Sequence, residues 1–196
     1  MPSTGSEHVA KLVDAGFVET VRQGRHRYVR IADPRVAELI EHLAQHAEQR
    51  PHPGLRASLR VQRLAAARTC YDHLAGRLGV ALHAGMIGTG LIDTSDGLAI
   101  TLAGKEVLYE IGVPAGHSTG RPLLRECLDW TERREHLGGA FPAALLDRAL
   151  AADWLRRGDD RSIRIRPAAR EPLAALGVDI DRLAAVADSP TSTARR

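Results

Sequence analysis

The sequence is poor in several residue types, and each shortage excludes a class of protein. Only two of its 196 residues are cysteine, which excludes a disulfide-stapled scaffold and favours reduced thiols. Aromatic residues make up only 4%, so the core depends on small aliphatic side chains, which favours helical units over a β-sandwich. The chain has no run of about 18 apolar residues and no signal-peptide pattern at its start. We therefore expect a cytoplasmic protein that does not enter a membrane.

Lysine is also scarce, because Lys11 and Lys105 are the only lysines among 27 basic residues. Arginine suits bidentate contacts to phosphate or guanine, although a codon bias toward arginine gives the same composition. We find no nucleophile–base pair, paired carboxylates or phosphate-binding loop, and we predict that the chain is not an enzyme. Gly85, Gly88 and Gly90 are in the wrong order for a dinucleotide-binding loop and are expected in a helix.

The first 50 residues predict a helix, a basic hairpin and a second helix. Apolar residues recur at helical spacing up to Gly16, and two runs rich in Val, Tyr and Thr follow around a Gln-Gly-Arg turn. Asp33-Pro34 then starts a helix with its own apolar stripe. The expected elements are a helix ending near Gly16, strands at 17–22 and 26–31, and a helix at about 36–49.

A helix followed by a basic ribbon is the shape of a winged helix-turn-helix, in which the helix enters the major groove and the wing follows the phosphate backbone. Polar side chains on the helix are able to reach base edges or phosphates, and the arginines neutralise phosphates. The candidate DNA-binding residues are Thr4, Ser6, Glu7, His8 and Lys11 on the helix, and Arg22, Arg25, Arg27 and Arg30 on the hairpin.

The rest of the chain contains an internal repeat. The stretch Arg68-Thr-Cys70-Tyr-Asp72 matches Arg125-Glu-Cys127-Leu-Asp129, and the order of further matches is preserved as far as Val113 and Val178. Each copy is predicted to form helix, helix, short strand and turn, strand, helix. The predicted organisation is a partial winged helix-turn-helix (1–50), a linker (51–63), repeat 1 (64–114), repeat 2 (121–187) and a disordered tail (188–196).

The N-terminal region resembles the ArsR (SmtB-like) transcriptional regulators. Ser3 to Val18 is similar to their recognition helix, Gly24 to Ile31 to their wing, and the segment that starts at Asp33-Pro34 to their last helix. The resemblance covers roughly residues 2–48. The repeats resemble the C-terminal extension of a longer subgroup of that family. The resemblance implies a repressor that acts as a homodimer on promoter DNA and is released by a ligand. It also adds Ser3 to the residues that face DNA.

The resemblance is incomplete at the N-terminus, because the family places three helices before the recognition helix and only Met1-Pro2 stands here. We expect that the true start lies upstream, and a natural truncation is the alternative. The overall fold expected is mainly α with short β-hairpins, a partial winged helix-turn-helix followed by two winged-helix-like repeats.

Metal sites known in the family match this chain poorly. The recognition-helix cysteines of the cadmium and lead sensors correspond to Lys11 and Ala15. The last-helix ligands of the zinc, cobalt and nickel sensors correspond to Asp33, Arg35, His46 and Gln49, of which only the first and third keep a ligand. His42 and His46 lie four residues apart and form either a weak metal site or two solvated histidines.

The repeat offers a different candidate set. Cys70, Asp72 and His73 recur as Cys127, Asp129 and His136, although the insertion 130–135 separates the last two. If the copies pack symmetrically, Cys70, His73, Cys127 and His136 converge as ligands for a divalent soft metal. The alternatives are buried free cysteines with histidines that complete the core, or thiols that sense oxidants.

The function predicted from the sequence is a DNA-binding transcriptional regulator, a repressor that a ligand or stress signal releases from promoter DNA. Two alternatives stay open. One is a metal- or thiol-responsive sensor that uses the cysteines and histidines of the repeats. The other is a protein-interaction module that has lost DNA binding.

Overall fold

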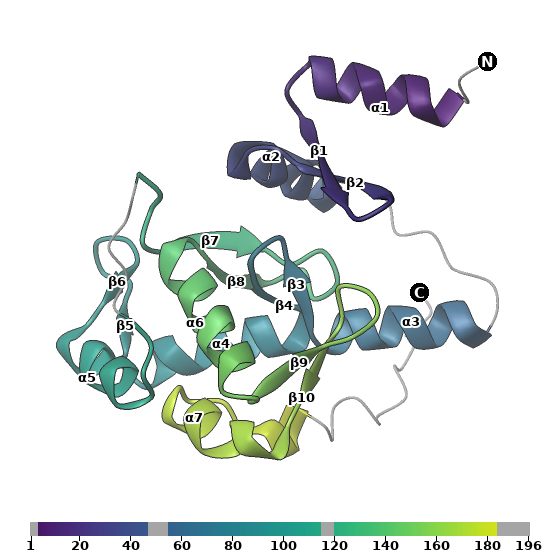
Figure 1. The fold of residues 1–196 in the computed structure, drawn as a ribbon. Helices are drawn as coiled ribbons and strands as arrows, with labels where there is room; N and C mark the ends of the chain where they lie inside the picture. The colour runs from purple at the N-terminus through teal and green to yellow at the C-terminus, as the bar shows by residue number, and fades with distance from the viewer. Residues whose placement is uncertain (1–3, 47–54, 115–119, 184–196) are drawn as a thin grey trace, which may run out of the picture. The chain divides into compact units, whose positions relative to one another are not determined.

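The computed structural model describes residues 4–46, 55–114 and 120–183. The chain divides into two compact units, Met1–Gln49 (unit 1) and Arg50–Arg196 (unit 2), which are drawn in Figure 1. Within the described residues, no helix has both the length and the apolar character needed to cross a membrane.

Unit 1 contains two helices and a hairpin in the order that the sequence predicts. Gly16 follows the first helix in a left-handed conformation (φ 72°), which suits a glycine that ends a helix. The strands pair antiparallel from Val18 opposite Ile31 to the turn. The elements are α1 (Thr4–Asp14), β1 (Val18–Gln23), β2 (His26–Ile31) and α2 (Pro34–His46), so the predicted helices and strands of this unit are confirmed.

Unit 2 is built from helices and four antiparallel hairpins among its described residues. A leading helix, α3 (Leu55–Ala66), precedes the duplicated region. The first copy contains β3 (Arg68–Cys70), β4 (His73–Ala75), α4 (Gly76–Gly88), β5 (Ile92–Asp93), β6 (Ala99–Ile100) and α5 (Leu102–Glu110). The second contains β7 (Arg125–Leu128), β8 (Glu135–Gly138), α6 (Ala140–Ala151), β9 (Leu155–Arg157), β10 (Ile163–Ile165), η1 (Pro167–Ala169) and α7 (Arg170–Ala175).

The two copies interlock through their central helices. Helix α4 of the first copy packs on β8 of the second, α6 of the second packs on β4 of the first, and β4 lies against β8. Leu78 and Met86 of α4 are fully buried in the same apolar cluster as Phe141 and Leu146 of α6. Because each helix covers the other copy's hairpin, the two repeats share one core.

Matched residues of the repeat occupy matched positions in the structure. Val113 donates its N–H to the carbonyl of Leu108 at the end of α5, and Val178 donates to Leu173 at the end of α7. All four side chains are buried. Residues that match in the sequence repeat therefore also occupy equivalent positions in the two copies of the fold.

Two expectations about unit 2 are wrong. Each copy begins with a hairpin instead of a helix, because strands of only three or four residues with mostly buried side chains show no alternation that periodicity could detect. Helix α3 also occupies most of the expected linker 51–63. Its residues Val61, Leu64 and Ala65 recur at helical spacing and are half-buried, which explains why this segment is helical.

Candidate functional site

Helix α1 presents its polar candidates to the surface. Thr4, Ser6, Glu7, His8 and Lys11 are all exposed, and Thr4, Glu7 and Lys11 lie opposite the half-buried Val9 and Val13, with Ser6 and His8 flanking. Ser3 lies outside the described residues. The helix therefore has a continuous polar face along its N-terminal two turns, where a recognition helix makes its base contacts.

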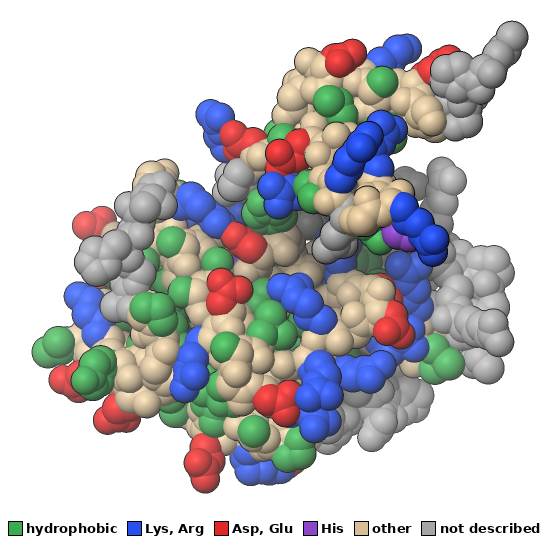
Figure 2. All heavy atoms as spheres, in the orientation of Figure 1, with side chains coloured by type: hydrophobic (Ala, Val, Ile, Leu, Met, Phe, Trp, Pro, Cys, Tyr) green, Lys and Arg blue, Asp and Glu red, His purple; other side chains and the backbone are tan. Residues whose placement is uncertain are grey.

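The β1–β2 hairpin carries its arginines in two different environments. Arg22 and Arg27 are directly opposite each other across the strands, and Arg25 stands in the turn. Arg30 donates from Nε to Oε1 of Glu19 at 2.6 Å, so its charge is partly compensated. Figure 2 shows basic side chains gathered along this hairpin.

Arg22, Arg25 and Arg27 have no carboxylate partner among the described residues. Like charges placed directly opposite on a hairpin are destabilising unless an anion neutralises them. The pair Arg22–Arg27 therefore does not stabilise the free hairpin. It suits a surface that binds the phosphates of DNA.

The last-helix metal positions of the resemblance do not form a site among the described residues. Arg35 donates from Nη2 to Oδ2 of Asp33 at 2.8 Å and thereby occupies the one carboxylate of the set. His46 is exposed. Gln49 and the side chain of His42 lie outside the described residues.

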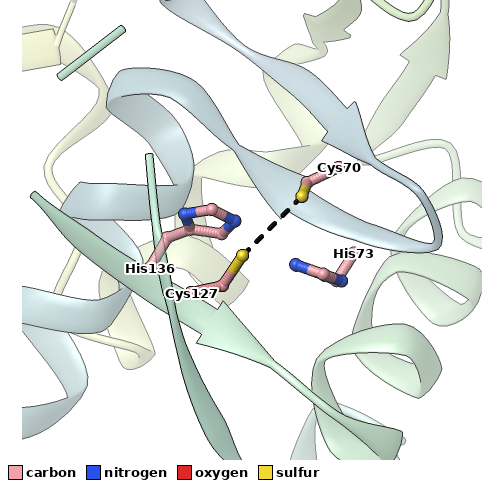
Figure 3. Close-up of side chains that lie close together, drawn as sticks. All are labelled: Cys70, His73, Cys127 and His136. Atoms are coloured by element: carbon pink, nitrogen blue, oxygen red, sulfur yellow. Dashed lines mark hydrogen bonds between the residues drawn. The ribbon is translucent and has the colours of Figure 1, made fainter. Parts of the chain in front are cut away.

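The four candidates in unit 2 come together. Cys70 pairs with His73 across β3–β4, and Cys127 pairs with His136 across β7–β8, in the same register. The insertion 130–135 lengthens the second hairpin loop and leaves the cysteine–histidine pairing unchanged. The duplicated hairpins thus place two equivalent cysteine–histidine pairs face to face, as Figure 3 shows.

The cluster is compact and closed to solvent. All four residues are buried, and one ligand atom from each lies within 4.8 Å of the others. The two sulfurs are 3.9 Å apart, far beyond the roughly 2.05 Å of a disulfide bond. The imidazole ring centroids of His73 and His136 are 5.2 Å apart, and both rings face the sulfurs in Figure 3.

The cluster alters the acidity of its own members. The pKa of Cys127 is lowered, chiefly by its hydrogen bond with the Cys70 thiol and also by the imidazoles of His136 and His73, against the opposing effect of burial. Burial alone would lower the pKa of His73, but Asp72 and Cys127 raise it above its ordinary value. The arrangement therefore favours a thiolate at Cys127, the form that binds metals and reacts with oxidants.

A carboxylate lies beside each histidine of the cluster, and only the first is hydrogen-bonded to it. Asp72 accepts a hydrogen bond from Nδ1 of His73 at 3.2 Å and from Nη1 of Arg121 at 2.6 Å. Asp129 lies in the equivalent place of the second hairpin, with its Oδ2 3.7 Å from Nδ1 of His136.

Asp129 is also the centre of a buried network that the sequence did not predict. Its carboxylate accepts hydrogen bonds from Nη2 of Arg68 at 2.9 Å, the backbone N–H of Gly76 at 2.6 Å and the hydroxyl of Thr131 at 2.6 Å. Burial opposes ionisation, but Arg68 and these donors lower the pKa of Asp129 to about 2. In the sequence, the only hint that Arg68 has a structural role was its recurrence as Arg125 in the repeat.

Two further sequence features are placed by the structure. Gly85 and Gly88 lie in α4, as expected, whereas Gly90 lies beyond its end in a turn with a φ of 73°. A second hairpin rich in arginine is β9–β10, where Arg156 stands opposite Arg164. Arg156 donates from Nη2 to Oδ1 of Asp153 at 3.0 Å, so this hairpin has a compensating carboxylate that Arg22 and Arg27 lack.

Comparison with known proteins gives one informative relative. The chain is 37% identical over 168 residues to the "Uncharacterized HTH-type transcriptional regulator YdfF" of Bacillus subtilis (strain 168), with 84% of this chain and 74% of that protein covered. That share of the chain exceeds unit 2 alone, so the similarity extends into unit 1. No family model matches the chain, and no solved structure matches it.

Proposed function

Because this chain belongs to the HTH-type transcriptional regulators, the family that includes YdfF of Bacillus subtilis, we propose that it binds double-stranded promoter DNA through α1 and the β1–β2 hairpin. The family makes the chain a DNA-binding regulator of transcription and not an enzyme, which confirms the prediction drawn from the sequence. Helix α1 enters the major groove, and the hairpin lies along the phosphates as a wing.

The observation that carries this proposal is the uncompensated arginine pair of the hairpin. Arg22 and Arg27 stand opposite each other on an exposed ribbon, with Arg25 at its turn and no carboxylate partner among the described residues. Phosphate oxygens supply the negative charge that this arrangement lacks. Thr4, Ser6, Glu7, His8 and Lys11 then contact base edges and neighbouring phosphates.

The finer assignment is an ArsR-like repressor that a ligand or stress signal releases from DNA. The resemblance of residues 2–48 to that family supports it. The buried thiols and imidazoles of unit 2 also support it, because they are groups through which a metal or an oxidant acts on a protein.

We also propose that the regulator is a homodimer, with α2 as the surface that meets a second copy. Leu39, Ile40 and Leu43 of α2 are 51%, 47% and 63% exposed and form one apolar stripe. A stripe of this kind on a helix is usually covered by another apolar surface. In sedimentation experiments we expect the wild type to sediment as a dimer and Leu43→Glu to shift it to the monomer. A wild-type monomer at all concentrations contradicts the dimer.

The test of DNA binding compares two basic hairpins of the same chain. In fluorescence anisotropy with a fragment of the chain's own promoter, Arg22→Ala/Arg27→Ala weakens binding at least about tenfold, because two phosphate contacts are lost. The matched control is Arg156→Ala/Arg164→Ala, which removes an opposing arginine pair from β9–β10 and leaves the affinity within about twofold. Equal losses in both variants, or a loss only in the control, overturn the assignment of the wing.

A further inference from the structure

We propose that Cys70, His73, Cys127 and His136 bind one divalent metal ion of the Zn²⁺ type, which joins the two repeats of unit 2. This proposal does not depend on DNA binding by unit 1. It rests on four observations: the spacing of the ligand atoms, the unsatisfied ring nitrogens, the charge balance of the site and its closure to solvent.

The spacing of the ligand atoms is close to that of a tetrahedral site. Zn²⁺ binds sulfur at about 2.3 Å and nitrogen at about 2.0 Å, which separates its four ligand atoms by roughly 3.3–3.8 Å. The sulfurs of Cys70 and Cys127 are 3.9 Å apart, and all four candidate atoms lie within 4.8 Å of one another. A contraction of less than about 1.5 Å in the widest separations converts the cluster into a metal site.

Among the described residues, the histidines have buried nitrogens without a hydrogen bond of good geometry, although the Cys127 sulfur interacts with both rings. These atoms are Nε2 of His73 and both ring nitrogens of His136. A buried polar atom without a partner is costly, and such atoms in a native fold call for an explanation. Because Asp72 holds Nδ1 of His73, Nε2 is the atom turned toward the sulfurs, which is the usual arrangement of a metal-binding histidine and its supporting carboxylate.

The charge balance favours a divalent ion. Two thiolates and two neutral imidazoles carry two negative charges, which a divalent ion cancels and a monovalent ion does not. A neutral assembly matters here because all four residues are buried, and an uncompensated buried charge is expensive. Two sulfur and two nitrogen ligands also match the preference of Zn²⁺ over Mg²⁺ or Ca²⁺, which take oxygen.

The site is closed, and this defines its role. Four protein ligands complete a tetrahedron and leave no open position for substrate, which is typical of a structural or regulatory metal and not of a catalytic one. Two ligands come from β3–β4 and two from β7–β8, so the ion binds hairpins of both copies. Metal binding should therefore be coupled to the stability of the shared core.

The experiment uses the full chain and Co²⁺ as a spectroscopic probe for Zn²⁺. We expect one Co²⁺ per chain, visible bands of tetrahedral cobalt, near-ultraviolet thiolate charge transfer, and displacement of the cobalt by one Zn²⁺. Cys70→Ser and Cys127→Ser each abolish the charge-transfer pattern of a two-thiolate site. The matched control is His83→Asn, which removes a half-buried histidine outside the cluster and leaves the spectrum and stoichiometry unchanged.

A second variant keeps the test decisive if a cysteine substitution unfolds the chain. Asp72→Asn leaves all four ligands in place and removes the carboxylate behind His73, so it should weaken Zn²⁺ binding about 10- to 100-fold. Absence of a tetrahedral cobalt spectrum in the reduced wild type overturns the proposal. So does rapid formation of a Cys70–Cys127 disulfide that Zn²⁺ fails to prevent, since that result assigns the pair to oxidant chemistry.

Discussion

Arg68 and Asp129 show how single residues hold the candidate site in place. Arg68 is 1% exposed and Asp129 is fully buried, and the guanidinium also lies over the ring of Trp130 with Cζ 4.5 Å from its centroid. Arg68 belongs to the first repeat and Asp129 to the second. Through this pair, a residue of the first copy therefore holds the β7–β8 loop that precedes His136 in the second copy.

Removing one partner of this pair should be strongly destabilising. Arg68→Met leaves the carboxylate of Asp129 buried without its cation, which costs about 3–5 kcal/mol in the free energy of unfolding. The control Arg60→Met breaks an exposed ion pair with Asp160 and should cost at most about 1 kcal/mol. Denaturant titration followed by circular dichroism measures both, and equal effects would show that the Arg68–Asp129 pair has no special role.

At the scale of single residues, the sequence predicted that the two cysteines and two histidines converge, and it did not predict the Arg68–Asp129 network beside them. Cysteine and histidine were found because their chemistry and their recurrence in the repeat are both visible in the sequence. Thr131, which binds Asp129 through its hydroxyl, lies in an insertion that the other copy lacks. Comparing the two copies of the repeat therefore could not reveal the role of Thr131.

At the scale of helices and strands, the hairpins that open each repeat set the geometry of the cluster. Cross-strand pairing brings Cys70 beside His73 and Cys127 beside His136. The sequence predicted helices there, because β3 and β4 have only three residues each and their side chains are all buried. The longer strands β1 and β2 were predicted correctly, since six residues with Val, Tyr and Thr give a clear signal.

Helix α4 offers a test of how closely the repeats pack. A Cβ at Gly85 would lie 2.5 Å from the carbonyl oxygen of Gly177, whereas a Cβ at Gly88 meets nothing within 4 Å. Gly177 itself has φ +76° and ends α7, so it has little freedom to move away. The close contact joins α4 of one copy to the end of α7 in the other.

We expect Gly85→Ala to lower the free energy of unfolding by about 1–3 kcal/mol through overpacking. Gly88→Ala on the same helix should leave stability unchanged or raise it by at most about 1 kcal/mol, because alanine favours helix. Thermal melts of the two variants beside the wild type measure the difference. A Gly85→Ala variant as stable as Gly88→Ala would mean that the copies do not approach this closely in solution.

At the scale of the whole molecule, duplication explains why the convergence of distant residues could be predicted. Two similar segments that bury each other's apolar faces tend to pack symmetrically, and symmetry brings equivalent residues together. The interlocking of α4 with β8 and of α6 with β4 could not be predicted, because it depends on which copy each helix covers.

The proposed regulatory function depends most on DNA binding by unit 1. The direct measurement is the affinity of the wild-type chain for its promoter fragment at several salt concentrations. Arg22, Arg25 and Arg27 alone should contribute a slope of about −2 to −3 in a plot of log affinity against log salt, since each phosphate contact adds roughly −0.9. A linear fall of at least this steepness is the predicted result. Absent binding, or binding that does not change with salt, would contradict DNA binding by unit 1 and favour a protein-interaction module.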